Sequence, residues 1–125
     1  MRVEVYYNLH KKCFSVRALE GENKGRVINH TRALTLEDVK FVVREGGRKK
    51  VLEEKRKNVH AFVRGTLVKC VTIKDRGTAT YNPYRYSTFV DKETQEPVYE
   101  SKAVFMTNYT ASKKPVIEYA LSTCA

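Results

Sequence analysis

The alternation of apolar and polar residues at the N-terminus constrains the fold more than any other feature of this sequence. Apolar residues recur at every second position, first at Val3, Val5, Tyr7 and Leu9 and then at Phe14, Val16 and Ala18. A period of two residues is that of a β-strand with one buried face. The chain is therefore predicted to open with two strands, separated by the polar residues 10–12.

Further strands are predicted along the chain. A short strand at 26–30 is expected to pair back across the turn-like residues 21–25, which read GENKG. Residues 59–73 are read as one long strand, or as two strands bent at Gly65. The remaining strand predictions are Val39 to Val43, Thr88 to Val90, the two arms 98–99 and 103–107 of a last hairpin, and Val116 to Leu121.

A helix is predicted within residues 44–58, because REGGRKKVLEEKRKN is rich in Arg, Lys, Glu and Leu. Gly46 and Gly47 weaken its first turn, so the helix is expected to begin around Arg48. Only Val51 and Leu52 are clearly apolar, which leaves an exposed, basic face. The predicted fold class is α+β: an antiparallel β-sheet with one central basic helix and C-terminal β-hairpin strands, in a single domain over residues 1–125.

The composition narrows the environment of the protein. Hydrophobic residues make up 42% of the 125 residues, which argues against global disorder. No apolar run approaches the ~20 residues that span a bilayer, and the alternating N-terminus does not resemble a signal peptide. The three cysteines, Cys13, Cys70 and Cys124, are odd in number and widely spaced, as reduced thiols are. We therefore expect a cytoplasmic protein without a membrane segment and without a structural zinc site.

The net charge of +10 favours anionic partners, because 24 Lys and Arg residues oppose 14 Asp and Glu residues. Nucleic acids, nucleotides and acidic protein surfaces all meet this condition. The alternative is that the charge serves solubility alone.

Catalytic motifs find little support. His10, His30 and His60 lie in no nucleophile elbow and on no metal-binding helix, and the sequence has neither a Walker loop nor a dinucleotide fingerprint. Cys70 and His60 could form a dyad through the fold, although a small buried cysteine in a strand explains Cys70 as well. The prediction is a protein that is not an enzyme and needs no metal or cofactor.

The aromatic-basic stretch 74–91, KDRGTATYNPYRYSTFVD, is the strongest candidate for binding. Guanidinium groups bind phosphate oxygens in a planar, bidentate manner, and tyrosine rings stack on bases. A flat, anionic ligand such as a nucleotide suits this combination. Tyr84, Tyr86 and Phe89 alternate with polar residues, however, and packing into the core would explain them equally.

Two other basic segments are weaker candidates. Residues 55–60 bring a lysine-arginine run close to His60, either as a binding cluster or as a C-terminal cap of the helix. The segment 21–30 carries Lys24, Arg26 and His30, which form either a second ligand site or an ordinary hydrophilic turn.

The segments NLHKKCFSV (8–16), GRVINH (25–30) and EEKRKNVHAFV (53–63) resemble small phage-encoded proteins. With the length and the aromatic-basic stretch, the chain is similar to the first-described Thoeris anti-defence sponge family. The resemblance implies a phage protein that sequesters cyclic ADP-ribose isomers, and in some members cyclic di- or trinucleotides, without cleaving them. It also implies assembly into homodimers or hexamers, acting in the infected bacterial host.

The resemblance also implies particular ligand-binding residues. Arg56 and Arg76 would be the ligand-binding arginines, and Tyr81 would stack on adenine. Polar contacts would come from Asp91 or Glu93, and Asn108 or Tyr109 stands where the family has an arginine. A second site for a cyclic trinucleotide would use Lys24, Arg26 and His30. The chemistry of the residues, apart from the resemblance, adds Asn82 to these ligand-binding residues as a contact to ribose hydroxyls.

The alternative function is that of a nucleic-acid-binding phage protein, such as an anti-CRISPR or anti-restriction protein. The charge of +10 and the basic helix motivate it. A lyase using His60 is a third, more distant reading. The distribution of charge distinguishes these readings: a broad basic surface favours nucleic acid, whereas basic and tyrosine side chains converging on one concavity favour a small ligand.

Overall fold

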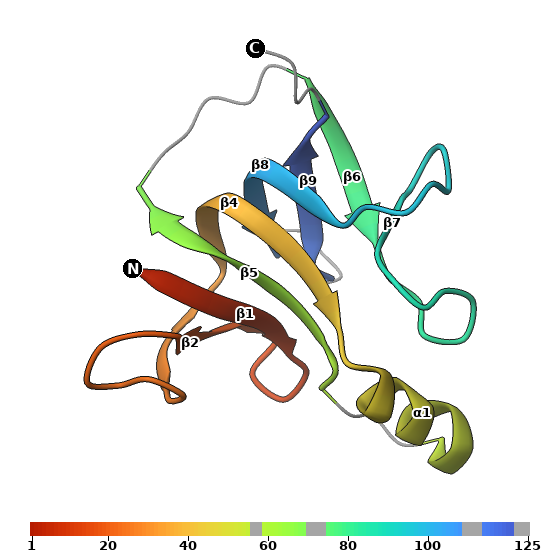
Figure 1. The fold of residues 1–125 in the computed structure, drawn as a ribbon, viewed down its shortest axis with the longest axis horizontal. Coiled ribbons are helices and arrows are strands. Elements are labelled where there is room, and N and C mark those ends of the chain that lie inside the picture. The colour runs from red at the N-terminus through yellow and green to blue at the C-terminus, as the bar shows by residue number, and fades with distance from the viewer. Residues whose placement is uncertain (56–58, 70–74, 109–113, 122–125) are drawn as a thin grey trace.

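One curled, antiparallel β-sheet makes up most of the protein (Figure 1). The computed structural model describes residues 1–55, 59–69, 75–108 and 114–121. The elements in these ranges are β1 (Arg2–Asn8), β2 (Cys13–Ala18), β3 (Val27–Thr31), β4 (Ala33–Val43), α1 (Glu45–Glu54), β5 (Ala61–Val68), β6 (Arg76–Thr80), β7 (Val90–Asp91), β8 (Glu100–Thr107) and β9 (Val116–Ala120). Along the sheet the strands follow the order β3-β2-β1-β5-β4-β8-β9-β6-β7.

The predicted N-terminal strands are confirmed as the hairpin β1–β2. Val3 and Val5 are fully buried on the inner face of the sheet, where Val5 pairs with Val16 of β2. Glu4 and Tyr6 point to the opposite face, because successive residues of a strand alternate between faces. The predicted strand at 26–30 is confirmed as β3, which pairs with β2.

Strand β4 contains an irregularity that matters for the packing around it. Its register with β5 shifts between Glu37 and Lys40, and Asp38 has a positive φ of 50°. The extra residue lets Leu36 and Val39 both reach the core, where each is at most 1% exposed. Gly65 of β5 lies against this irregularity: a Cβ atom there would come within 3.0 Å of the Glu37 carbonyl oxygen.

The α+β prediction with a central helix is wrong, because the protein is mostly antiparallel β-sheet with one short helix in the described ranges. Helix α1 lies beyond the ends of β4 and β5 and covers no face of the sheet (Figure 1). It buries only Val51, so it cannot form a second layer. No helix in the described part of the chain is long and apolar enough to cross a membrane.

The start of α1 also differs from the prediction. The helix begins at Glu45, so it includes Gly46 and Gly47 in its first turn. A Cβ atom on Gly47 would lie 2.5 Å from the Cβ atom of His60, which shows how closely this turn packs on the residue before β5. Gly47 weakens the helix propensity of this turn, but the lack of a side chain at Gly47 is what allows the close contact with His60.

The C-terminal part of the chain folds differently from the predicted hairpin. Residues 100–107 form the single strand β8, and residues 98–99 are not its pairing partner. β8 instead pairs with β9, which confirms the predicted strand at 116–121 to within one residue. The start of the aromatic-basic stretch, 76–80, is strand β6 and pairs with β9.

The hydrophobic core fills the inner face of the curled sheet. Phe89 links its aromatic members, because its ring centroid lies 5.0 Å from that of Phe41 and 5.3 Å from that of Tyr81. A pocket of about 210 Å³ that is partly open to solvent lies against this core. Its lining includes Val5 of β1, Val63 of β5 and Ile117 of β9, so strands far apart in the sheet order surround one interior.

The paired residues Leu36 and Leu67 offer a test of this core. Leu36 is fully buried, whereas Leu67, its direct partner across β4 and β5, is 39% exposed. We expect Leu36→Ala to lower the free energy of unfolding by about 2–5 kcal/mol and Leu67→Ala by about 1 kcal/mol or less. Urea unfolding of the two variants measures the difference. Equal losses would contradict the burial of Leu36 in the core.

Candidate functional site

The residues expected to bind a cyclic nucleotide lie in separate surroundings. Arg56 is outside the described residues. Arg76, on β6, forms an exposed ion pair with Glu118 of β9, with 3.2 Å between Nη1 and the carboxylate. Asn82 is exposed and closes the turn after β6, because its side-chain oxygen accepts a hydrogen bond from the backbone N–H of Tyr84 at 3.0 Å.

Tyr81 is the expected site residue that lines the partly open pocket of about 210 Å³. Its ring packs on Phe89, and its hydroxyl lies 2.6 Å from Nε2 of the buried His60. Arg48 of α1 lies close to the same hydroxyl and donates from Nε to the backbone oxygen of Tyr86 at 3.0 Å. Burial raises the pKa of Tyr81 to about 12. The three side chains thus connect α1, the start of β5 and the turn after β6.

Asp91 and Asn108 are buried and engaged within the protein. Asp91 accepts hydrogen bonds from the Tyr119 hydroxyl and from the backbone N–H groups of Glu93 and Thr94. These bonds, that of Tyr119 first, hold the pKa of Asp91 below its ordinary value. Asn108 donates to the backbone oxygen of Lys12 and accepts from Arg32 Nε at 3.1 Å, which ties the β1–β2 turn to the end of β8.

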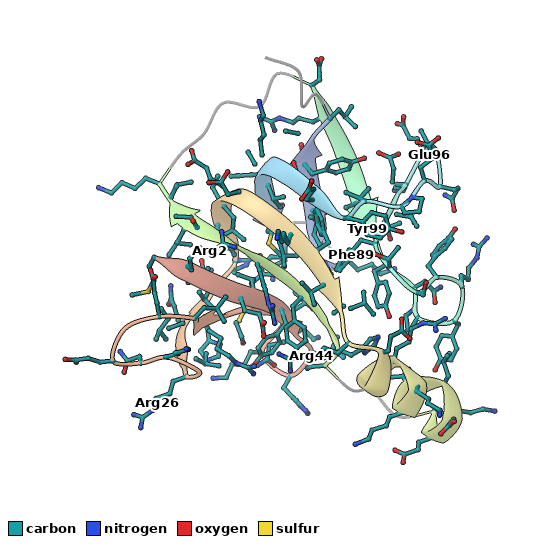
Figure 2. All side chains as sticks on the ribbon, in the orientation of Figure 1. Arg2, Arg26, Arg44, Phe89, Glu96 and Tyr99 are labelled. Carbon is teal, nitrogen blue, oxygen red and sulfur yellow. The ribbon has the colours of Figure 1, made fainter. Side chains whose placement is uncertain are left out.

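The residues of the expected second site are also dispersed. Lys24 and Arg26 are exposed on the connection between β2 and β3, where Arg26 points away from the sheet (Figure 2). His30 lies on the outer face of β3, with Nδ1 3.0 Å from the hydroxyl of Ser15. The described residues of both expected sites therefore do not share one pocket.

A different group of basic residues does converge, on the outer face of β1, β2 and β5. Glu4 is only 1% exposed, and both of its carboxylate oxygens contact arginines. The distances are 3.4 Å from Arg17 Nη1, 3.2 Å from Arg44 Nη2 and 2.7 Å from Arg64 Nε. We call Glu4 and these three arginines the guanidinium cluster. Their charges sum to +3 − 1 = +2.

Strand pairing explains how this cluster forms from distant segments. Glu4 lies directly opposite Arg17 on β2 and Arg64 on β5. Arg44 comes from the junction of β4 and α1 (Figure 2), and its Nη2 donates to the same carboxylate at 3.2 Å. Four segments of the chain therefore place charged groups at one point of the sheet.

Two aromatic rings orient the guanidinium groups. The Arg44 guanidinium lies 4.4 Å above the centroid of the buried Phe62 ring, and that of Arg17 lies 5.7 Å from the centroid of Tyr6. The two rings meet edge to face, with centroids 6.0 Å apart. Cation–π contacts of this kind fix the planes of the guanidinium groups.

Further basic residues surround the cluster. Arg2 lies at the start of β1 and donates from Nη1 to the backbone oxygen of Asp38 at 2.9 Å (Figure 2). Lys40 is exposed on β4 and pairs in register with Arg64. The arrangement has the chemistry of an anion-binding surface, because arginine forks match the geometry of phosphate oxygens.

The sequence contained part of the signal for this site. The alternation that buries Val3 and Val5 places Glu4 and Tyr6 on the opposite face. What the sequence could not supply was the pairing of β1 with β5, which are separated by more than fifty residues. Without that register, Arg17 and Arg64 are two basic residues among many.

The fold and this site define a class: an antiparallel β-protein with a basic, arginine-rich outer face. A family model described as the Mycobacterium phage L5 gene 82 protein matches residues 1–114. The gene 82 protein of Mycobacterium phage L5 is 42% identical over 115 residues, which cover 86% of this chain and 91% of that protein. The chain therefore belongs to this phage protein family. No solved structure matches the chain.

The contact between Tyr81 and His60 can be tested by mutation. Tyr81→Phe removes the hydroxyl that lies 2.6 Å from the buried His60 Nε2. We expect a loss of about 1 kcal/mol in the free energy of unfolding at neutral pH. Tyr84→Phe, the same change on a side chain that is 62% exposed, serves as the control and should cost almost nothing.

The raised pKa of Tyr81 adds a pH dependence to this prediction. Because the folded-state pKa of about 12 exceeds the ordinary value of 10.0, folding favours the neutral phenol. This contribution is complete below pH 10.0 and is lost as the pH rises towards about 12. The difference in unfolding free energy between wild type and Tyr81→Phe should therefore shrink over that range. A constant or growing difference would contradict the burial of this hydroxyl.

Proposed function

We propose that this protein is a non-enzymatic nucleic-acid-binding protein that acts in the cytoplasm of the infected bacterial host. The observation that carries the proposal is the guanidinium cluster, in which three arginines converge on one carboxylate and leave a charge of +2. Phosphate groups along a nucleic acid are the natural partners of such a surface.

The overall charge supports the same class of partner. A net charge of +10 attracts polyanions over long range, and the cluster supplies short-range hydrogen bonds at one place. Basic residues lie on both sides of the cluster, with Arg2 at one end of β1 and Lys12 in the turn beyond its other end. A surface of this extent fits a polymer of phosphates better than it fits one small molecule.

The proposal predicts binding that depends strongly on salt. We expect the wild-type protein to bind a fluorescein-labelled DNA duplex at low salt, with the logarithm of the association constant falling linearly with the logarithm of salt concentration. Fluorescence anisotropy measures both quantities. Arg44→Gln should weaken binding about tenfold. It should also reduce the magnitude of the slope of this logarithmic plot by about one.

Arg76→Gln is a closely matched control. The side chains of Arg76 and Arg44 are 49% and 50% exposed, and each contacts a carboxylate at 3.2 Å. Arg76 lies on β6, however, which is separated from β1 by several strands in the sheet order. Equal effects of the two substitutions would show that binding is not localised on the proposed face. No binding to DNA or RNA at low salt would remove the proposal.

The sponge function remains a second proposal. The guanidinium cluster also supports the sponge function, because arginine forks bind the phosphates of a cyclic nucleotide as well as those of a polymer. Tyr81, which lines the partly open pocket of about 210 Å³, would be the stacking ring of a site on the inner side of the sheet, apart from the guanidinium cluster of the same protomer. Closure of two protomers over the ligand, as homodimers or hexamers would permit, would then have to complete the site.

Ligand release distinguishes the sponge from an enzyme and from a polymer-binding protein. The protein is incubated with cyclic ADP-ribose isomers or cyclic oligonucleotides and is then denatured by heat. A sponge takes up the ligand at a fixed stoichiometry and returns it intact, which mass spectrometry detects. Failure to take up any of these ligands would remove the second proposal, and a cleaved ligand would indicate catalysis.

A further inference from the structure

The guanidinium cluster has donors beyond those that contact Glu4. The carboxylate engages Arg17 Nη1, Arg44 Nη2 and Arg64 Nε, which leaves the other N–H groups of the three guanidiniums outside these contacts. Arg17 Nε is buried and has no hydrogen-bond partner among the described residues. A buried donor without a partner is rare in a folded protein and calls for an explanation, of which a bound water or ion is one.

The cluster remains open to solvent on its outer side. The side chains of Arg17, Arg44 and Arg64 are 29%, 50% and 38% exposed, whereas Glu4 beneath them is 1% exposed. One carboxylate can neutralise only one of the three cations, and the remaining positive charges repel one another at close range. An anion placed over the three guanidiniums would relieve this repulsion and could accept hydrogen bonds from several of them.

We propose that the guanidinium cluster is a preformed site for one phosphate group, and that Glu4 is a positioning residue that holds the three guanidiniums in place. The site rests on the proposed nucleic-acid-binding function and identifies where a backbone phosphate of the polymer is anchored. The rings of Tyr6 and Phe62 complete the arrangement, because each carries one of the guanidinium groups.

If Glu4 has this role, removing its charge should change anion binding in the direction opposite to that expected from simple electrostatics. Removing a negative charge from a basic surface ordinarily strengthens the binding of an anion. If Glu4 positions the arginines, Glu4→Gln weakens binding instead, because the guanidiniums lose their common acceptor and their mutual orientation. The direction of the change therefore separates a positioning residue from a mere neighbour.

Arg17→Lys is the second, independent variant. It keeps the positive charge on β2, where the Arg17 side chain is partly exposed, but removes both the planar fork and the unpartnered Nε donor. We expect the dissociation constant for a DNA duplex to rise about tenfold. Binding that depends on charge alone would leave the constant unchanged.

The Arg76–Glu118 pair supplies matched controls for both substitutions. It joins one arginine to one carboxylate at 3.2 Å, on strands β6 and β9. Arg76→Lys should leave duplex binding unchanged, and Glu118→Gln should leave it unchanged or slightly tighter. Circular dichroism melting of every variant establishes that binding is measured on folded protein. If Glu4→Gln does not fold, Arg17→Lys alone decides whether the site exists.

The outcomes separate the two proposals. Duplex binding by wild type that is weakened by Arg17→Lys and by Glu4→Gln supports the phosphate site. Duplex binding that survives Arg17→Lys overturns the site while leaving the proposed function intact, and tighter binding by Glu4→Gln overturns the positioning role. If wild type binds no nucleic acid, the proposed function fails. Calorimetry with inorganic pyrophosphate then decides the site: binding lost in Arg17→Lys supports it, and no binding overturns it.

Discussion

The pairing of β1 with β5 is the interaction on which the rest of the structure depends. These strands join the N-terminal part of the sheet, β3-β2-β1, to the remaining strands, and they do so through four paired residues on each strand. The ladder is antiparallel and places Val3 opposite Gly65. Since β1 and β5 are far apart in the sequence, the loss of chain entropy on pairing must be offset by burial on the inner face. The fully buried Val3 and Val5 provide that burial.

The same ladder creates the guanidinium cluster on the outer face. Glu4 lies between the two buried valines of β1, and its register partner on β5 is Arg64, at 2.7 Å. A slip of the register by one residue would have two effects at once: it would expose the valines, and it would separate Glu4 from Arg64. A buried carboxylate without its arginines would be costly, so the outer face also disfavours incorrect registers. The register that forms the core is thus the register that forms the site.

The sequence predicted individual strands better than it predicted their arrangement. The alternation at 3–9 and 14–18 depends only on neighbours along the chain, and it identified β1 and β2 correctly. The helix within 44–58 was also predicted, but its predicted place at the centre of the fold was wrong. With only Val51 buried, α1 is an appendage at the end of β4 and not the centre of an α+β fold. Propensity indicates where a helix forms, whereas the apolar area of the helix determines whether it can organise a domain.

The aromatic-basic stretch 74–91 shows why composition is a poor guide to a site. Within the part of it that the structure describes, Tyr81 and Phe89 pack towards the interior, whereas Arg76 lies on the exposed side of β6. Residues that are close in sequence thus point in different directions because they belong to strands and turns. The residues of the guanidinium cluster, in contrast, are scattered through the sequence and share no motif. Their convergence is a property of three-dimensional pairing, which a single sequence does not display.

The use of aromatic rings within the cluster determines what kind of recognition this face can offer. The Phe62 ring is 2% exposed and lies beneath Arg44, so it is not available to stack on a base. Tyr6 is likewise partly covered, by Arg17. The strongly exposed tyrosines, Tyr84 and Tyr99, lie outside the strands that carry the cluster. This face therefore presents charge and oriented hydrogen-bond donors, which recognise phosphates, whereas the Phe62 and Tyr6 rings that the structure describes in the cluster are engaged by arginines and are not free to read unpaired bases.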